Sequence, residues 1–316
     1  MLSRIAESFF WIGRYLERAD ATARILDSHL STLVEDPSVE EAAASRTLLE
    51  VMGIEAVDLP AGTRVDNALV LRLLGHDPDS GSSTVYAIGC ARESARRARE
   101  TVSAEVWEAI NTTWHAVAHG QLQAMRPHLA SRLVVERVAM ISGLVEGTVT
   151  HDESWQFLVL GRSIERVDMT ARLLSNASLS AGTATVWGTT LRACGALEAF
   201  TRTYRGRLAQ REAAEFLLLD PLFPRSVLHS LQQAEACVAA LDYGAPRRGG
   251  PGTHGEAARL LGRARAELEY RPLADVLTDL AGEMERIQQR ATRASEAIAA
   301  RWFPTPATPG WRVGDL

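Results

Sequence analysis

Lysine is absent from this sequence, and all 34 basic residues among its 316 residues are arginine. Schiff-base lysines, pyridoxal-phosphate lysines and the lysine of a phosphate-binding P-loop are therefore excluded from any mechanism of this chain. Arginine differs from lysine because its planar fork of N–H donors pairs with a carboxylate through two bonds. The fixed positive charge of this chain is carried by guanidinium groups alone.

Cysteine is rare, and Cys90, Cys194 and Cys237 lie far apart in the sequence. Such a set fits neither a disulfide framework nor a zinc site, and it is typical of a reducing compartment. There is also no apolar run of about 18 residues, so we expect no membrane span. The first residues, 1–7, enter an expected helix at once and do not resemble a signal peptide. We therefore expect a cytoplasmic protein.

Charged and apolar residues occur at ordinary levels. Apolar residues make up 46% of the chain and charged residues 23%, as in an ordinary globular protein. The length is enough for one large domain or two small ones. The net charge is 34 − 39 = −5, which argues against a nucleic-acid binder.

Two stretches of the chain, residues 13–26 and 161–174, match position by position at a constant offset. Both read Gly-Arg-x-x-Glu-Arg-x-Asp-x-Thr-Ala-Arg-x-Leu. Each also has apolar residues at steps of three and four, which predicts an amphipathic helix with its apolar stripe in the core. The stripes are Phe9, Ile12, Leu16, Ala19, Ala23 and Leu26 in the first and Phe157, Leu160, Ile164, Val167, Ala171 and Leu174 in the second.

The charged residues beside each stripe match in identity as well as in sign. They are Arg14, Glu17, Arg18, Asp20 and Arg24 in the first stretch and Arg162, Glu165, Arg166, Asp168 and Arg172 in the second. A solvated face has no reason to repeat the same charged residue at each position, so the identities indicate fixed partners.

Two interpretations of these charges stay open, and they do not exclude each other. In the first, the glutamates and arginines form a buried or half-buried network that locks the two halves together, with every charge paired. In the second, Arg14, Arg18, Arg24 and their copies line a site for an anion or carboxylate. Glu17 and Glu165 are then candidate catalytic acid/base groups in a polar seam between the halves.

Helical patterns cover nearly the whole chain, and strand signals are almost absent. Caps and breaks predict helices at about 3–34, 39–53 with Ser38 as cap, 64–74, from Thr84 after Ser83, from Ser103, 127–146, 154–175, 187–207, from Ser226 to 241, 255–270 and 272–301. A short apolar helix, a proline-containing loop and a serine precede a long helix both at 72–83 and at 215–226. The sequence therefore predicts an all-α protein of two tandem similar helical-bundle repeats packed as one unit. We place the repeats at 1–147 and 148–303 and a loose tail at 304–316.

Two further clusters of polar residues lie on these expected helices. The helix expected from Thr84 carries Arg92, Glu93 and Arg96. These side chains form either a solvated face with local ion pairs or a face that completes the polar seam around Glu17. His115 and His119 are four residues apart but have no acidic partner at ligand spacing, so we predict no metal site.

The motif that the two stretches share also resembles the motif of a known protein family. The chain resembles the bacterial alpha-E domain family over essentially its full length. Matching regions are 8–20, 78–83 with 91–93, Ser103 with 105–111, 155–174 and 216–226. Departures are a longer entry to the helix at Thr84, Ser94 where Asn is common, and an apparent insertion rich in glycine and arginine after Tyr243.

The resemblance implies an all-helical fold and association with circularly permuted ATP-grasp proteins and with transglutaminase-like or other peptidase-type proteins. It implies a setting of ATP-dependent formation or processing of an amide or peptide bond. ATP and magnesium would belong to the ATP-grasp partner, so no cofactor is expected in this chain. The resemblance attaches no activity to the alpha-E domain itself.

Three functional hypotheses follow from these observations. The chain is a non-catalytic partner or substrate-holding subunit of the ATP-grasp enzyme, which we favour because no recognisable catalytic constellation is present. Alternatively, it is an enzyme in which Glu17 and Glu165 act as acid or base while arginines hold a carboxylate or phosphate. A di-metal bundle of the ferritin type fits poorly, because arginine stands where that motif needs a metal ligand.

Overall fold

The computed structural model describes residues 1–60, 62–179, 184–205, 208–244 and 255–304. These residues form an all-α protein, and no strand occurs among them. The helices are α1 (Ser3–Glu35), α2 (Glu41–Val51), the short 3-10 helix η1 (Ala56–Asp58), α3 (Asn67–Val70), the π-helix η2 (Leu71–His76), α4 (Thr84–Arg97), α5 (Ala104–Val117), α6 (Pro127–Thr148), α7 (Glu153–Leu179), α8 (Ala184–Ala193), α9 (Leu197–Tyr204), α10 (Gln210–Leu219), α11 (Val227–Gly244), α12 (Glu256–Tyr270), α13 (Leu273–Thr278) and α14 (Leu280–Trp302). None of the helices in this described part is long and apolar enough to cross a membrane.

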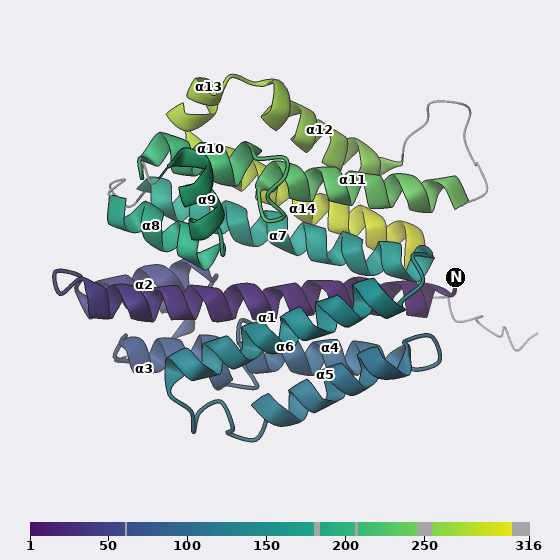
Figure 1. The fold of residues 1–316 in the computed structure, drawn as a ribbon, viewed down its shortest axis with the longest axis horizontal. Helices are drawn as coiled ribbons and strands as arrows, with labels where there is room; N and C mark the ends of the chain where they lie inside the picture. Colours follow the sequence, from purple (N-terminus) through teal and green to yellow (C-terminus); the bar gives the residue numbers. More distant parts are fainter. Residues whose placement is uncertain (61, 180–183, 206–207, 245–254, 305–316) are drawn as a thin grey trace, which may run out of the picture.

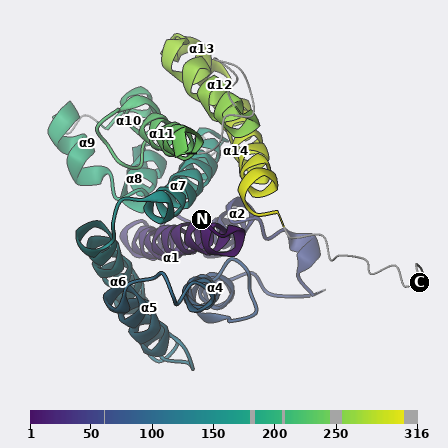
Figure 2. The same cartoon turned by 90° about the vertical axis from the view of Figure 1, so that its right-hand side faces the viewer.

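Two long helices, α1 and α7, lie side by side at the centre of the molecule (Figure 1). They begin together, where the amino group of Met1 lies 3.1 Å from Glu153 Oε2. Seen end-on, α4, α5 and α6 lie on the side of α1, whereas α11, α12 and α14 lie on the side of α7 (Figure 2). The matching stretches 13–26 and 161–174 therefore lie on the two helices that join the halves of the chain.

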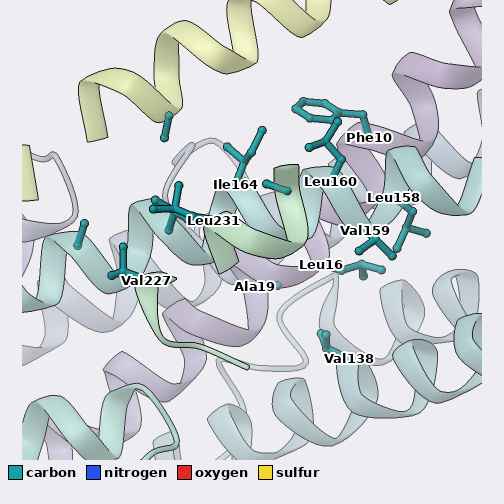
Figure 3. Close-up of a cluster of buried hydrophobic side chains, with 14 of the residues drawn as sticks. Phe10, Leu16, Ala19, Val138, Leu158, Val159, Leu160, Ile164, Val227 and Leu231 are labelled. Atoms are coloured by element: carbon teal, nitrogen blue, oxygen red, sulfur yellow. The ribbon is translucent and has the colours of Figure 1, made fainter. Parts of the chain in front are cut away.

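The predicted apolar stripes of α1 and α7 form the core. All twelve residues of the two stripes are buried, none with more than 5% of its surface exposed. Figure 3 shows Phe10, Leu160 and Ile164 grouped on one side of this core and Leu16 and Val138 on another. The stripe therefore does what its periodicity predicts: it removes apolar surface from water on the face that meets the other helices.

Glycine lets α1 and α7 approach each other closely. A Cβ atom on Gly13 would overlap the carbonyl oxygen of Leu158, and a Cβ atom on Gly161 would overlap that of Phe10. These two contacts are reciprocal, because the two glycines occupy the same position in the matching stretches. Both obstacles are main-chain atoms, which cannot move aside as a flexible side chain can. The close crossing therefore requires glycine at both positions.

The loops that lead into α4 and α11 have the same capping arrangement. Ser83 Oγ accepts from Tyr86 N at 3.0 Å and donates to Asp77 O at 2.5 Å. Ser226 Oγ makes the same two bonds, with His229 N at 3.0 Å and with a carbonyl at 2.5 Å, that of Asp220. The prediction that Ser83 caps a long helix is confirmed, because its side chain satisfies an otherwise unpaired amide of the first turn.

Several helix boundaries differ from the sequence prediction. Ser38 does not cap α2; the Glu40 carboxylate accepts from the first amides of that helix instead. The expected helix at 64–74 begins later, at Asn67, because Asp66 caps it at Leu69 N, and it continues as a π-helix. A change from α-helical to π-helical hydrogen bonding leaves no signature in hydrophobic periodicity.

Two helices that the sequence predicted as continuous are interrupted. The helix expected at 187–207 breaks between α8 and α9, where Gly195 has a φ of 63°. The helix expected at 272–301 breaks at Asp279, whose side chain accepts from Gly282 N and caps α14. Three segments lie mainly outside the described residues, at 180–183, 245–254 and 305–316. They are the interval between the helices expected at 154–175 and 187–207, the segment rich in glycine and arginine after Tyr243, and the tail from 304.

Candidate functional site

Glu165 of α7 is paired with two arginines of α1. Arg14 Nε lies 2.6 Å from Glu165 Oε2, and Arg18 Nε lies 2.6 Å from Oε1. The glutamate side chain is 0% exposed, and those of Arg14 and Arg18 are 13% and 26% exposed. One carboxylate thus bridges two guanidinium groups that are one helical turn apart, and each of its oxygens has a charged donor.

Glu17 of α1 is paired in the reverse direction. Arg166 of α7 has its Nε 2.9 Å from Glu17 Oε2, and Arg225, in the loop before α11, has Nη2 3.1 Å from Oε1. Burial alone would raise the pKa of Glu17, but the nearby Arg225 and Arg166 outweigh that effect and hold the pKa at about 2. Glu17 is therefore a stable anion and a weak base.

The two aspartates of the matching stretches hold the next arginine on their own helix. Arg24 Nε lies 2.9 Å from Asp20 Oδ2, and Arg172 Nε lies 2.9 Å from Asp168 Oδ2. Asp20 also accepts from Arg225 Nη2 at 2.5 Å, whereas Asp168 accepts from the Gln288 amide at 3.1 Å. The pairs within each helix match, and the partners from outside the stretches differ.

Arg162 of the second stretch turns to α6. Its Nη2 lies 3.1 Å from Glu146 Oε1. Its counterpart Arg14 instead binds Glu165 and donates to Ser295 of α14 at 3.2 Å. Arg162 and Arg166 also line a pocket of about 280 Å³ at the surface of α7. The two stretches are therefore alike in sequence but not in surroundings.

Arg92, Glu93 and Arg96 belong to a separate set of contacts. Arg92 donates to Asn111 Oδ1 at 2.7 Å, and Arg96 binds Glu93 at 2.8 Å on the surface. The alternative that this face completes the Glu17 seam is wrong for the described contacts, because α4 turns these side chains toward α5 and toward solvent. Glu93 and Arg96 form a local ion pair of the kind that the other interpretation predicted, whereas Arg92 binds a neutral amide.

Sequence reasoning missed two partners of this network. Arg225, which pairs with both Glu17 and Asp20, lies far from both along the chain. Glu146, which pairs with Arg162, is at the end of α6. The sequence offered one indication of Arg225: it directly precedes Ser226, in the loop that corresponds to the loop before Ser83 in the first half of the chain.

The cysteines and histidines form no comparable cluster in the described part of the chain. Cys90, Cys194 and Cys237 are free thiols, and burial raises the pKa of Cys194 to about 12 and that of Cys237 to about 11. His119 lies at the end of α5, edge-on to Trp114. Among the described residues, no three His, Cys, Asp or Glu side chains are grouped as they would be to hold a metal ion. The Glu–Arg pairs between α1 and α7 are thus the candidate site that the sequence motif and the structure have in common.

The low pKa of Glu17 predicts a loss of stability in acid. The pKa is about 2 in the folded protein and 4.5 ordinarily, so the unfolded chain takes up a proton first as the pH falls. The stabilising contribution of Glu17 is full above about pH 5, and about 2 kcal/mol of it is lost by about pH 3.

Urea unfolding of the wild type and of Glu17→Gln at several pH values measures this contribution. The difference between their unfolding free energies should shrink by about 2 kcal/mol from pH 6 to pH 3. Glu285→Gln, at an exposed position of α14, is the control, and its difference should stay constant within about 0.5 kcal/mol. A constant difference for Glu17→Gln as well would contradict the assignment of a lowered pKa.

Comparison with known proteins gives one family and a group of longer relatives. A family model described as a predicted alpha-helical domain with a conserved ER motif matches residues 1–303. An uncharacterised protein of Mycobacterium bovis is 27% identical over 257 residues, and one of Mycobacterium tuberculosis is 26% identical over the same length. Each match covers 74% of this chain and 29% of the relative, so this chain spans less than a third of their length. No solved structure matches it.

Proposed function

Because the chain belongs to the Alpha-E family, we propose that it is a non-catalytic partner or substrate-holding subunit of an ATP-grasp-dependent system that forms or modifies amide or peptide bonds. Its partner would be a circularly permuted ATP-grasp protein, which brings ATP and magnesium. A transglutaminase-like or peptidase-type protein would be a further partner, and the system would work in the cytoplasm. The resemblance found in the sequence motivates this setting.

The pairing of both repeated glutamates carries the proposal. A general base needs a free lone pair directed at the substrate and a pKa near the working pH. Glu17 has a pKa of about 2, and each oxygen of Glu165 lies 2.6 Å from a guanidinium nitrogen. These properties suit a structural network and not acid/base chemistry. The much greater length of the mycobacterial relatives also supports a role beside other polypeptide.

The repeated contacts support a proposed organisation into two similar helical bundles, 1–147 and 148–303. Gly13 and Gly161 make reciprocal close contacts, and Ser83 and Ser226 make equivalent caps. Glu17 pairs across to α7 and Glu165 pairs across to α1. In this organisation the Glu–Arg network locks the two bundles into one unit.

The pocket beside Arg162 and Arg166 favours the second candidate, an enzyme of the same system. Those two arginines could hold a carboxylate or phosphate while an acid/base group acts on it. Glu17 lies next to this pocket through Arg166. This alternative requires a change in the Glu17 environment when substrate binds.

Co-purification with a circularly permuted ATP-grasp protein of the same organism tests the proposal. Size exclusion with light scattering should show a complex, and ADP release by the ATP-grasp protein should change when this chain is added. Separate elution together with unchanged ADP release would overturn the partner role. With a complex in hand, loss of turnover in a folded Glu17→Gln or Glu165→Gln variant would favour the enzyme, and loss of folding would favour the structural network.

A further inference from the structure

The pocket of about 280 Å³ lies between α7 and α11 and is bordered by the end of α6. Its polar lining includes Trp155, Arg162 and Arg166 of α7, His229 and Gln233 of α11, and Glu146 of α6. This volume lies just below the range of about 300 to 1,000 Å³ that is typical of ligand pockets, so the pocket has room for a small ligand only. Its walls are more polar than those of the core beside it.

The equivalent region beside Arg14 and Arg18 is filled by aromatic side chains. Trp11 and Tyr15 stack with ring centroids 5.2 Å apart, and Arg14 and Arg18 lie over these two rings at 5.5 and 5.8 Å. Burial raises the pKa of Tyr15 to about 12, and Cys90 adds to the effect. The arginines of the first stretch are thus covered by a packed wall of rings.

Corresponding positions in the two halves follow from aligning Gly13 with Gly161 on α1 and α7, and Ser83 with Ser226 before α4 and α11. At four of the corresponding positions that line the pocket, the second half has a residue without a phenyl or indole ring. The pairs are Trp11 and Val159, Tyr15 and Ser163, Tyr86 and His229, and Cys90 and Gln233. Replacement of two large rings by valine and serine explains why a pocket is present beside Arg162 and Arg166.

Two donor groups on residues that line the pocket have no partner in the described part of the protein. Arg162 Nε and Trp155 Nε1 are both buried and unpaired there. The indole is held in place by the ring of His151, stacked on it at 4.1 Å. A buried N–H without a partner is costly and uncommon, so these two donors point to a ligand with acceptor oxygens.

The residues that line the pocket carry an excess of positive charge, with the two arginines Arg162 and Arg166 against the one carboxylate of Glu146. Arg162, Arg166 and Arg225 lie close together, and Arg225 and Arg166 share Glu17 as a partner. Desolvation lowers the pKa of Arg166, Glu17 raises it, and the neighbouring Arg225 and Arg162 lower it further, so that the pKa lies below its ordinary value. Glu146 already pairs with Arg162, and Glu17 with Arg166 and Arg225, so a bound anion would add to these pairs and relieve the repulsion that remains among the three guanidinium groups.

We propose that the pocket between α7 and α11 binds a carboxylate, as found on an amino acid or at the C-terminus of a short peptide, through Arg162, Arg166 and the Trp155 N–H. The planar guanidinium fork matches a carboxylate, and the indole supplies a third, neutral donor. Only the choice of amino acid or peptide as the source of the carboxylate rests on the proposed function. Inorganic phosphate presents similar oxygens and is the competing source.

Calorimetric titration of the full chain tests the site without any partner protein. The probes are N-acetyl-alanyl-alanine, its C-terminal amide, and inorganic phosphate. We expect the free carboxylate to bind with a Kd on the order of 1 mM or tighter, and the amide at least about 10-fold more weakly, because charged hydrogen bonds are lost. Phosphate that binds more tightly than the dipeptide would overturn the carboxylate assignment.

Variants locate the binding. Trp155→Phe keeps a ring but removes the donor and should weaken the dipeptide about 5-fold, and Arg162→Gln should weaken it about 10-fold or more. Ser163→Tyr, which copies Tyr15 of the first stretch, should fill the pocket and abolish binding; His229→Tyr serves the same purpose if that variant does not fold. Trp107→Phe and Arg92→Gln make the same exchanges outside the pocket and should bind as the wild type does.

The inference would be overturned if the wild-type protein did not bind the dipeptide. It would also be overturned if folded variants of the pocket bound the dipeptide as tightly as the control variants do. The result is separate from that of the proposed function, because no ATP-grasp protein is present in the titration. If the chain formed the complex but did not bind the dipeptide, the proposed partner role would stand and the proposed carboxylate site would be rejected. If the chain bound the dipeptide but formed no complex, the proposed carboxylate site would stand and the proposed partner role would be rejected.

Discussion

Replacement of Glu165 by glutamine should lower the free energy of unfolding by about 3–5 kcal/mol, because it removes the shared partner of two largely buried arginines. Arg14 and Arg18 both reach this one carboxylate at 2.6 Å, and its side chain is fully buried. The amide of glutamine has the same shape but no charge, and its nitrogen would face a guanidinium donor. Urea unfolding monitored by circular dichroism measures the loss.

A matched control is available on the surface. Glu93→Gln removes the partner of Arg96 and Arg97 on α4, where the side chains are more than a third exposed. Exposed ion pairs contribute about 1 kcal/mol or less, so this variant should lose little. Equal, small losses for both variants would mean that the central network does not hold α1 and α7 together.

Replacement of Gly161 by alanine should cost about 3 kcal/mol or more, at the upper end of the range for overpacked sites. Its new methyl group would overlap the carbonyl oxygen of Phe10, and the two helices would have to move apart along their whole contact. That movement would also lengthen the ion pairs between Glu165 and the arginines of α1. Thermal and urea unfolding of the purified variant provide the measurement.

Gly143→Ala on α6 is the opposite case within the same chain. Gly143 is exposed in a helix, and nothing lies within 4 Å of a Cβ at that position. Alanine should stabilise the protein there by about 0.5–1 kcal/mol, because glycine loses more conformational freedom on folding. If Gly161→Ala were neutral or stabilising as Gly143→Ala is, the close crossing of α1 and α7 would be contradicted.

Arg166 connects the Glu17 ion pairs with the pocket. Arg166 pairs with Glu17 on one side and lines the pocket on the other. Since Glu17 belongs to α1 and the pocket lies between α7 and α11, a ligand held by Arg166 would be linked through a single ion pair to the packing of the two central helices. A change at Glu17 should therefore alter ligand affinity as well as stability.

The sequence determined the local features of this protein. Steps of three and four residues predicted the buried faces of α1 and α7, and all twelve stripe residues lie in the core. Ser83 predicted the start of α4, and the repeated identity of Glu17 and Glu165 predicted fixed partners. Such features depend on neighbours within about one helical turn, which is why periodicity and capping chemistry reveal them.

Only the tertiary structure decided which groups meet. Arg225 reaches Glu17 from a distant loop, Arg92 turns to α5, and a pocket opens beside Arg162. These outcomes depend on how closely α1 and α7 cross and on how the loops bring α4 and α11 onto them. Two nearly identical stretches thus acquire different surroundings, because the contacts of a side chain are set by the helices packed against it and not by its own sequence.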